Sequence, residues 1–193
     1  MRVLLLSLGI VIADQLSKLL VRGVQLPSLG IAWEGMPYGM SRPLLGDFFR
    51  LTYIENPGMA FGINPGGKIF FSLFSLVASI ALIAYLYHMR KGPMGFRLAI
   101  ATVLGGAIGN LIDRMFYGVF FGYAPLFHGR VVDFFDMDFF DLSVFGYHIS
   151  RFAVFNVADA SVTVGIILLL FLHQSDPRTD TPPASPPPPA EPS

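Results

Sequence analysis

Four stretches of this chain are apolar for close to the ~20 residues that a helix needs to cross a bilayer. They cover about residues 3–21, 69–87, 98–117 and 152–173. Such continuous runs are typical of membrane-spanning helices and lack the alternation of barrel strands, since a backbone in lipid must satisfy its own hydrogen bonds. The pattern predicts an all-α membrane protein with four transmembrane helices, folded as one domain over residues 1–174.

The first apolar run has an alternative interpretation as a cleaved signal peptide, because Arg2 precedes it. No cleavage site of the A-x-A kind follows the run, which continues instead into Asp14, Gln15, Ser17 and Lys18. We therefore expect the run to remain in the protein as a helix.

The segments between the runs are too long and too apolar to be simple linkers. In residues 22–67, the sequence RLTYIENPGMAFGI predicts a strand at Leu51–Ile54 and a turn at Asn56-Pro57-Gly58, and hence a small β-element. Residues 118–151 are rich in Phe and Tyr, which suits a surface at the level of the lipid headgroups. The Pro-rich end, residues 175–193, predicts a disordered tail.

Basic residues in the connections predict the orientation in the membrane. Arg90, Lys91 and Arg97 lie in the short link between the second and third runs. Placing this link in the cytoplasm puts both termini inside and the two long segments outside. The bias is moderate, because the first long segment is itself basic at Arg22, Arg42, Arg50 and Lys68.

Composition agrees with this class of protein and narrows the chemistry. The chain has 193 residues, of which 53% are hydrophobic and 13% are charged, too few charges for a typical soluble domain. Thirteen basic and 13 acidic residues leave no net charge, so there is no electrostatic case for nucleic-acid binding. Without cysteine, the chain has no disulfide, thiolate nucleophile or cysteine zinc site.

Polar residues gather where lipid should exclude them, and each is a candidate for function. The third run carries Asn110 and Asp113, and the fourth carries Asn156 and Asp159. Each pair has the spacing N-x-x-D, which puts amide and carboxylate on one face of a helix. In the predicted topology both pairs lie near the outer ends of their helices, and can meet there.

Other residues are consistent with a meeting of the two pairs near the outer ends of their helices. Gly105 and Gly109 are spaced for close approach of two helices, and alanines flank Asp159. Arg114 follows Asp113, and Asp133 is expected in the loop just outside the membrane, in an apolar setting.

Two close carboxylates do not ionise together easily and share a proton, which is the chemistry of an aspartic protease. The ionised member activates water while the protonated member polarises a peptide carbonyl. The residues alone leave structural roles open for Asp14 with Lys18, four residues apart, and for Asp113 with Arg114.

The sequence offers little support for a metal site or for a serine hydrolase. Asp136, Asp138 and Asp141 are interpreted as solvated loop charge, because they lack the spacing and glycine of a calcium loop. The histidines do not have the H-E-x-x-H spacing, and no serine sits in G-x-S-x-G, so neither a metal site nor a serine hydrolase is expected. The histidines are His88, His128, His148 and His173.

Five segments, in this order along the chain, resemble the lipoprotein signal peptidases (signal peptidase II), which are four-helix bacterial membrane aspartyl proteases. GGAIGNLIDR and FNVAD together are the most specific of them. The segments are ADQLSK (13–18), ENPGMAFGI (55–63), GGAIGNLIDR (105–114), VVDF (131–134) and FNVADASVTVG (155–165).

The resemblance implies an endopeptidase of the bacterial inner membrane with its site near the extracytoplasmic face. Its substrate is a prolipoprotein carrying a diacylglyceryl group, cut just before the lipidated cysteine. The resemblance implies no cofactor, metal or nucleic acid; membrane lipid surrounds the enzyme, and we expect a monomer. The implied catalytic pair is Asp133 and Asp159, supported by Asp14, Asn56, Asn110, Asp113, Arg114 and Asn156.

Two outer segments, 115–130 and 136–154, are longer than this family usually has. We expect the lid and the substrate groove beside the site to differ accordingly. The main alternative is a transporter or proton relay that uses the same Asp and Asn residues. A second is a scaffold protein in which they only hold the helices together.

Overall fold

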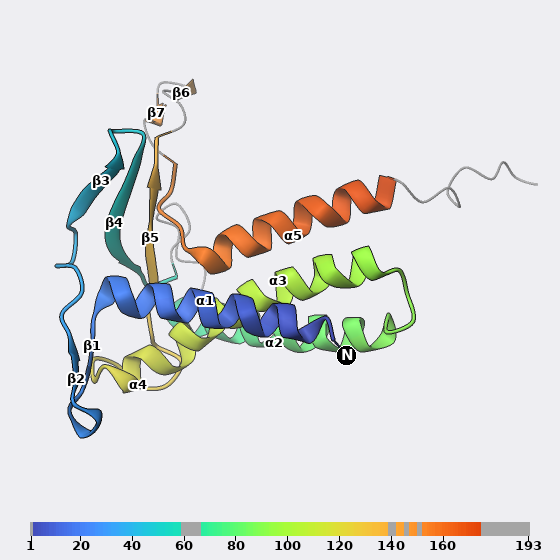
Figure 1. Ribbon diagram of the computed structural model, residues 1–193, viewed down its shortest axis with the longest axis horizontal. Coiled ribbons are helices and arrows are strands. Elements are labelled where there is room, and N and C mark those ends of the chain that lie inside the picture. The colour runs from blue at the N-terminus through green and yellow to red at the C-terminus, as the bar shows by residue number, and fades with distance from the viewer. Residues whose placement is uncertain (1, 59–66, 139–141, 145–146, 150–151, 175–193) are drawn as a thin grey trace, which may run out of the picture.

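The computed structural model describes residues 2–58, 67–138, 142–144, 147–149 and 152–174. Its long helices are α1 (Leu4–Arg22), α2 (Gly67–His88), α3 (Met94–Ile112) and α5 (Val157–Gln174). Beyond its C-terminal end, α3 continues through a π-helical turn, η2 (Asp113–Tyr117), into the short α4 (Gly118–Phe120). The helices run alongside one another, and the strands gather at one end of them (Figure 1).

The strands form one sheet and two small hairpins. The sheet has the antiparallel order β3 (Ser41–Leu45), β4 (Phe49–Asn56), β5 (Val131–Met137). One hairpin follows α1 directly and consists of β1 (Val24–Leu26), the 3-10 turn η1 (Pro27–Leu29) and β2 (Ile31–Trp33). The other pairs β6 (Leu142–Val144) with β7 (Tyr147–Ile149).

In the described part of the chain, three helical segments are long and apolar enough to cross a membrane: Leu4–Arg22, Ile69–His88 and Met94–Phe120. The apolar part of α5, Val157–Leu172, is shorter. Large apolar side chains on α2 and α5, such as Phe74 and Phe171, are two-thirds exposed. Such exposure costs free energy in water but not in lipid. The fold is that of a helical membrane protein with small antiparallel sheets.

Two sequence predictions need correction, and one is confirmed. The fourth helix begins at Val157 rather than near residue 152, because Phe155 forms an antiparallel bridge with Phe135 and extends the chain there. Asp133 lies on strand β5, not in a loop. The strand predicted at Leu51–Ile54 is confirmed, within the longer β4.

Helix α3 is central, since α1, α2 and α5 all pack against it. Glycines make the approach close: a Cβ on Gly106 would lie 2.3 Å from the carbonyl oxygen of Ala158 in α5. A Cβ on Gly105 would lie 2.9 Å from the Cβ of Ile10 in α1. These contacts confirm that the small residues allow the helices to approach closely.

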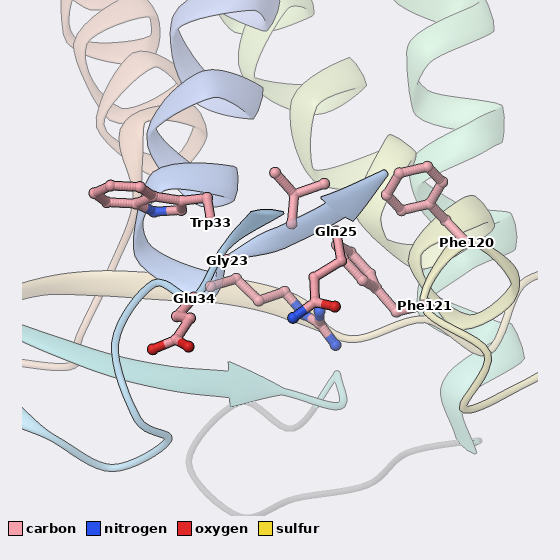
Figure 2. Close-up of a pocket in the computed structure, with 8 residues that line it drawn as sticks. Gly23, Gln25, Trp33, Glu34, Phe120 and Phe121 are labelled. Atoms are coloured by element: carbon pink, nitrogen blue, oxygen red, sulfur yellow. The ribbon is translucent and has the colours of Figure 1, made fainter. Parts of the chain in front are cut away.

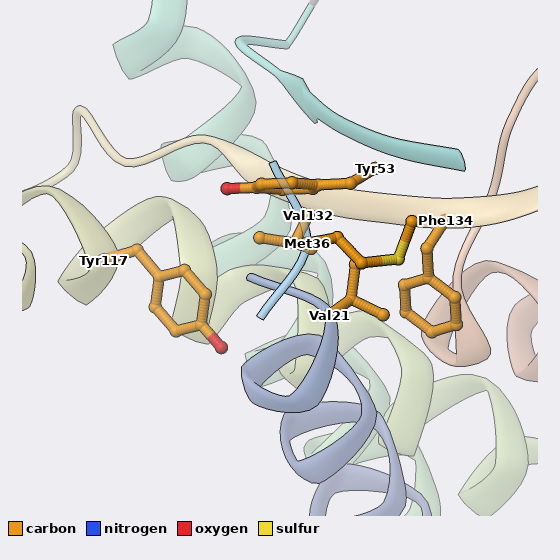
Figure 3. Close-up of a cluster of buried hydrophobic side chains, with 6 residues drawn as sticks. All are labelled: Val21, Met36, Tyr53, Tyr117, Val132 and Phe134. Atoms are coloured by element: carbon orange, nitrogen blue, oxygen red, sulfur yellow. The ribbon is translucent and has the colours of Figure 1, made fainter. Parts of the chain in front are cut away.

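Two clusters of buried side chains hold the ends of the bundle. At the sheet end, Figure 3 shows the first cluster, which joins α1, β4, β5 and η2. Its members are Val21, Met36, Tyr53, Tyr117, Val132 and Phe134. The second cluster packs α1, α2 and α3 together, and its members are Val3, Leu86, Ile100, Ala101 and Leu104.

Replacing Gly106 with Ala should destabilise the protein by about 1–3 kcal/mol, because the new methyl group meets backbone that does not yield easily. Gly9→Ala is the matched control, since a Cβ there meets nothing within 4 Å. Thermal unfolding of the two variants in the same detergent measures the difference. Equal melting temperatures would show that the α3–α5 contact is not tight.

Candidate active site

A buried lysine lies at the centre of the polar cluster. The Nζ of Lys18 lies 2.8 Å from Asp14 Oδ2 and 2.8 Å from Asp113 Oδ2, and all three side chains are fully buried. Its Nζ also donates a hydrogen bond of 3.0 Å to Asn110 Oδ1. The ion pair expected between Asp14 and Lys18 is therefore present, and Asp113 belongs to the same cluster.

The two carboxylates of this cluster also hold neighbouring backbone. Asp14 Oδ1 accepts the N–H of Ala158, in the first turn of α5, at 2.9 Å. Asp113 Oδ2 accepts the N–H of Val132, on β5, at 3.2 Å. Lys18 and its partners thus connect α1, α3, α5 and β5, so Asp14 and Asp113 have clear structural roles.

Asn156 immediately precedes α5 and closes its first turn. Its Oδ1 accepts the N–H of Asp159 at 3.0 Å, and its own N–H donates to Asp159 Oδ2 at 3.3 Å. This reciprocal arrangement is a capping box. The spacing N-x-x-D at Asn156 therefore reflects a helix start, not two residues on one face of a spanning helix.

The side-chain amide of Asn156 also reaches the strand. Its Nδ2 donates to Asp133 Oδ1 at 2.6 Å, and lies 3.1 Å from Asn110 Oδ1. Asn110 Nδ2 in turn donates to Asp159 Oδ1 at 2.7 Å. Two amides, Asn110 and Asn156, thus link a carboxylate on β5 to a carboxylate on α5.

Asp133 is buried in this network, 3% exposed, and makes no ion pair with a basic side chain in the described part of the chain. Burial raises the pKa of Asp133 to about 7, and the nearby charge of Asp159 adds to the effect. The hydrogen bond from Asn156 opposes it. Asp133 is thus a carboxyl group that can hold a proton near neutral pH.

Arg114 lies in η2, close enough to Asp133 and Asp159 for their charges to interact. One of its terminal nitrogens donates to the carbonyl oxygen of Asn110 at 3.4 Å. Its buried Nε finds no hydrogen-bond partner among the described residues. A buried donor of this kind is suited to bind a carbonyl oxygen of a ligand.

Asn56 ends β4, opposite Val131 and so near Asp133 on the neighbouring strand. Its Oδ1 accepts the N–H of Gly58 at 2.9 Å, and Gly58 has a φ of 96°, which favours glycine. The turn predicted at Asn56-Pro57-Gly58 is therefore confirmed. Residues 59–63 of ENPGMAFGI lie outside the described chain.

Asp136 was expected to be solvated loop charge, and this is wrong. It lies on β5, is 6% exposed and accepts a hydrogen bond of 2.7 Å from Thr52 Oγ1 on β4. The strand pairing that positions Asp133 also buries Asp136. Asp138 is half-buried, and Asp141 lies outside the described residues.

Two supporting residues were not recognised from the sequence. Gln15 Nε2 donates to Asp113 Oδ1 at 2.9 Å, and the hydroxyl of Tyr117 donates to Gln15 Oε1 at 3.0 Å. No pattern in the sequence indicates these contacts, which join residues about 100 positions apart. The capping box at Asn156, by contrast, has a spacing that could have been recognised.

The chain is similar to known proteins over most of its length. The family description "Signal peptidase (SPase) II" matches residues 6–174. A lipoprotein signal peptidase from Porphyromonas gingivalis is 38% identical over 162 residues, 70% of each chain. One from Moorella thermoacetica is 38% identical over 167 residues, 86% of this chain and 88% of the relative. A solved bacterial membrane enzyme superimposes with a TM-score of 0.67 at 29% identity, covering 93% of this chain and 92% of the other.

Lys18→Met should destabilise the protein by about 3–5 kcal/mol, because it leaves two buried carboxylates without their cation. Lys91→Met is the control, since Lys91 is exposed in the α2–α3 connection. Thermal unfolding in detergent compares the variants. Equal stability of the two would contradict a structural role for the ion cluster.

Proposed function

The chain belongs to the signal peptidase II family, and we propose that Asp133 and Asp159 are its catalytic pair. The protein is a membrane-embedded aspartic endopeptidase that removes the signal peptide from prolipoproteins. The observation that supports the pair most directly is the position of Asn156. It bonds Asp133 through its side chain and Asp159 through its backbone N–H and its side chain.

The different surroundings of the two carboxyl groups suggest their roles. Asp133 holds the shared proton, because its pKa is raised to about 7. Asp159, held by N–H donors on both oxygens, acts as the base. It takes a proton from water, whose oxygen attacks the carbonyl carbon of the scissile peptide, while Asp133 protonates the carbonyl oxygen. When the C–N bond breaks, the proton on Asp159 passes to the leaving amino group of the lipidated cysteine, and one hydroxyl proton of the intermediate returns to Asp133 as the carboxylic acid forms.

The remaining site residues support this pair. Asn110 and Asn156 fix the two carboxyl groups, and Asp14 and Asp113 hold the helix and the strand that carry them. The buried Nε of Arg114 would bind a carbonyl of the substrate backbone. Asn56 would shape the approach to the site from the end of β4.

We further propose that α5 is a fourth span and that the sheet faces outward. With 18 residues, α5 is about 27 Å long, close to the thickness of the hydrocarbon core. The basic residues Arg90 and Lys91 lie beyond α2, at the end of the bundle opposite the sheet. The positive-inside rule then gives cytoplasmic termini and an extracytoplasmic site in the bacterial inner membrane.

An apolar cleft of about 470 Å³ between α2, α3 and α5 suggests where the signal peptide lies. Its lining is almost wholly apolar, and includes Leu82 on α2, Ile100 on α3 and Leu169 on α5. A hydrophobic helix in this cleft, extended toward the outer end of α3, would lead to Asn110 and the catalytic pair. The protein is proposed to act as a monomer, with residues 1–174 as its single domain.

The transporter alternative is not favoured, because the ionisable cluster is confined to one end of the bundle. The buried Asp and Lys side chains lie in the second half of α1, just beyond the end of α3 and on β5, and the half-buried Asp159 lies at the start of α5. The rest of α5, from Gly165 to Leu172, is apolar.

Asp133→Asn and Asp159→Asn should each lower the rate of cleavage by at least ~100-fold, because either change removes the acid or the base. The assay follows cleavage of a purified diacylglyceryl-modified prolipoprotein in detergent. Asp136→Asn is the matched control, a buried aspartate on the same strand that should keep most of the activity. Wild-type turnover by either dyad variant would refute the assignment. A loss of activity that parallels a loss of thermal stability would favour the scaffold alternative.

The pKa of Asp133 also predicts a pH dependence of stability and of rate. Its pKa rises from about 3.8 in the unfolded chain to about 7 in the fold, so the folded state retains a proton that the unfolded state loses. Stability from this group is therefore lost as the pH rises from about 4 to about 7, and the cleavage rate should fall above about pH 7.

Melting temperatures of the wild type and Asp133→Asn at pH 5 and pH 8 test this prediction. The wild type should lose more stability than the variant over this range, and the variant should be the more stable of the two at pH 8. Parallel pH curves for the two proteins would contradict the raised pKa.

A further inference from the structure

A second polar site lies at the end of α1, apart from the catalytic pair. It is a cleft of about 330 Å³ between the end of α1, the β1–β2 hairpin and α4, shown in Figure 2. Arg22, Gln25 and Glu34 supply its polar lining, and Trp33 and Phe120 its aromatic lining. Because α1 is long and apolar enough to span a membrane and ends at Arg22, the cleft begins where the span stops.

Arg22 is held in place at this cleft. Its Nε donates a hydrogen bond of 3.0 Å to Glu55, and its guanidinium carbon lies 3.4 Å from the centre of the Phe121 ring. Among the described residues, its two terminal nitrogens have no hydrogen-bond partner. Glu55 also pairs with Arg130 at 3.5 Å, so one carboxylate is shared by two cations. A fixed guanidinium with free nitrogens is well suited to bind phosphate.

The rim of the cleft is apolar and exposed. Trp33 is 52% exposed and Phe120 is 53% exposed, and Leu29 at the tip of the hairpin is 69% exposed. The indole N–H of Trp33 donates to the carbonyl oxygen of Leu20 at 2.8 Å, which fixes the ring at the end of α1. Tryptophan at the end of a span is typical of the headgroup layer of a membrane. An arginine beneath an apolar rim at this depth matches a phospholipid better than a free anion.

We propose that this cleft binds a phospholipid, with its phosphate at Arg22 and Gln25 and its acyl chains passing Trp33 and Phe120. The site is additional to the protease activity and contains none of the proposed catalytic residues. A lipid bound here would fix the β1–β2 hairpin and α4 on the membrane surface.

The single tryptophan of the chain, Trp33, reports directly on this site. Full-length protein in detergent is titrated with phosphatidylglycerol brominated on its acyl chains, and the quenching of tryptophan fluorescence is measured. Saturable quenching is expected. Brominated diacylglycerol, which lacks the phosphate, should quench much less over the same range.

Two exposed residues of the cleft provide matched variants with opposite effects. Gln25→Glu adds a carboxylate next to Arg22 and should raise the half-saturating lipid concentration by about tenfold, equivalent to ~1.4 kcal/mol. Glu34→Gln removes a carboxylate from the same cleft and should lower it. Both variants should melt like the wild type and cleave prolipoprotein in detergent at the wild-type rate, so this test is separate from that of the protease assignment.

Three results would overturn the proposal. Equal quenching by phosphatidylglycerol and diacylglycerol would show that the phosphate is not recognised. Unchanged half-saturation in both variants would show that the cleft is not the binding site. Displacement of the lipid by millimolar inorganic phosphate would identify a site for free anions instead.

Discussion

The contact of Lys18 with Asp14 and Asp113 is the interaction on which the rest of the structure depends. The three charges are fully buried, and removing them from water is costly unless each finds partners. Backbone N–H groups help to meet this requirement: Ala158 on α5 donates to Asp14 Oδ1, and Val132 on β5 donates to Asp113 Oδ2. Satisfying the buried charges therefore also fixes the positions of the two elements that carry the proposed catalytic residues.

The proposed catalytic pair is assembled from two kinds of secondary structure. Asp159 is the third residue of a helix, held by a capping box, and Asp133 is the third residue of a strand. Asn156 meets both, because it lies at the point where the chain leaves its bridge with β5 and enters α5. An asparagine suits this position, since its amide donates to one carboxylate while its carbonyl oxygen accepts from the first turn of the helix.

Neighbouring carboxylates differ in role because their surroundings differ. Asp14 and Asp113 face a lysine and hold structure. Asp133 is buried beside Asp159, and burial together with the charge of Asp159 raises its pKa to about 7, against the hydrogen bond from Asn156. Asp136, three residues further along β5, bonds a threonine hydroxyl. Burial alone therefore does not identify the reactive group; the charge of the nearest neighbour does.

The sequence by itself predicted the membrane class, the four apolar helices and a set of candidate site residues. Apolar runs of span length and polar residues within them are local features, and they follow directly from the cost of placing polar groups in lipid. The resemblance to the family added the choice of Asp133 over Asp113, which the local pattern could not make. Only the tertiary structure decided that Asp113 pairs with Lys18, that Asn156 caps a helix and that Asp133 and Asp136 are buried on a strand. These outcomes depend on contacts between residues far apart in the chain, such as Gln15 with Asp113 and Ala158 with Asp14, and no local pattern encodes them.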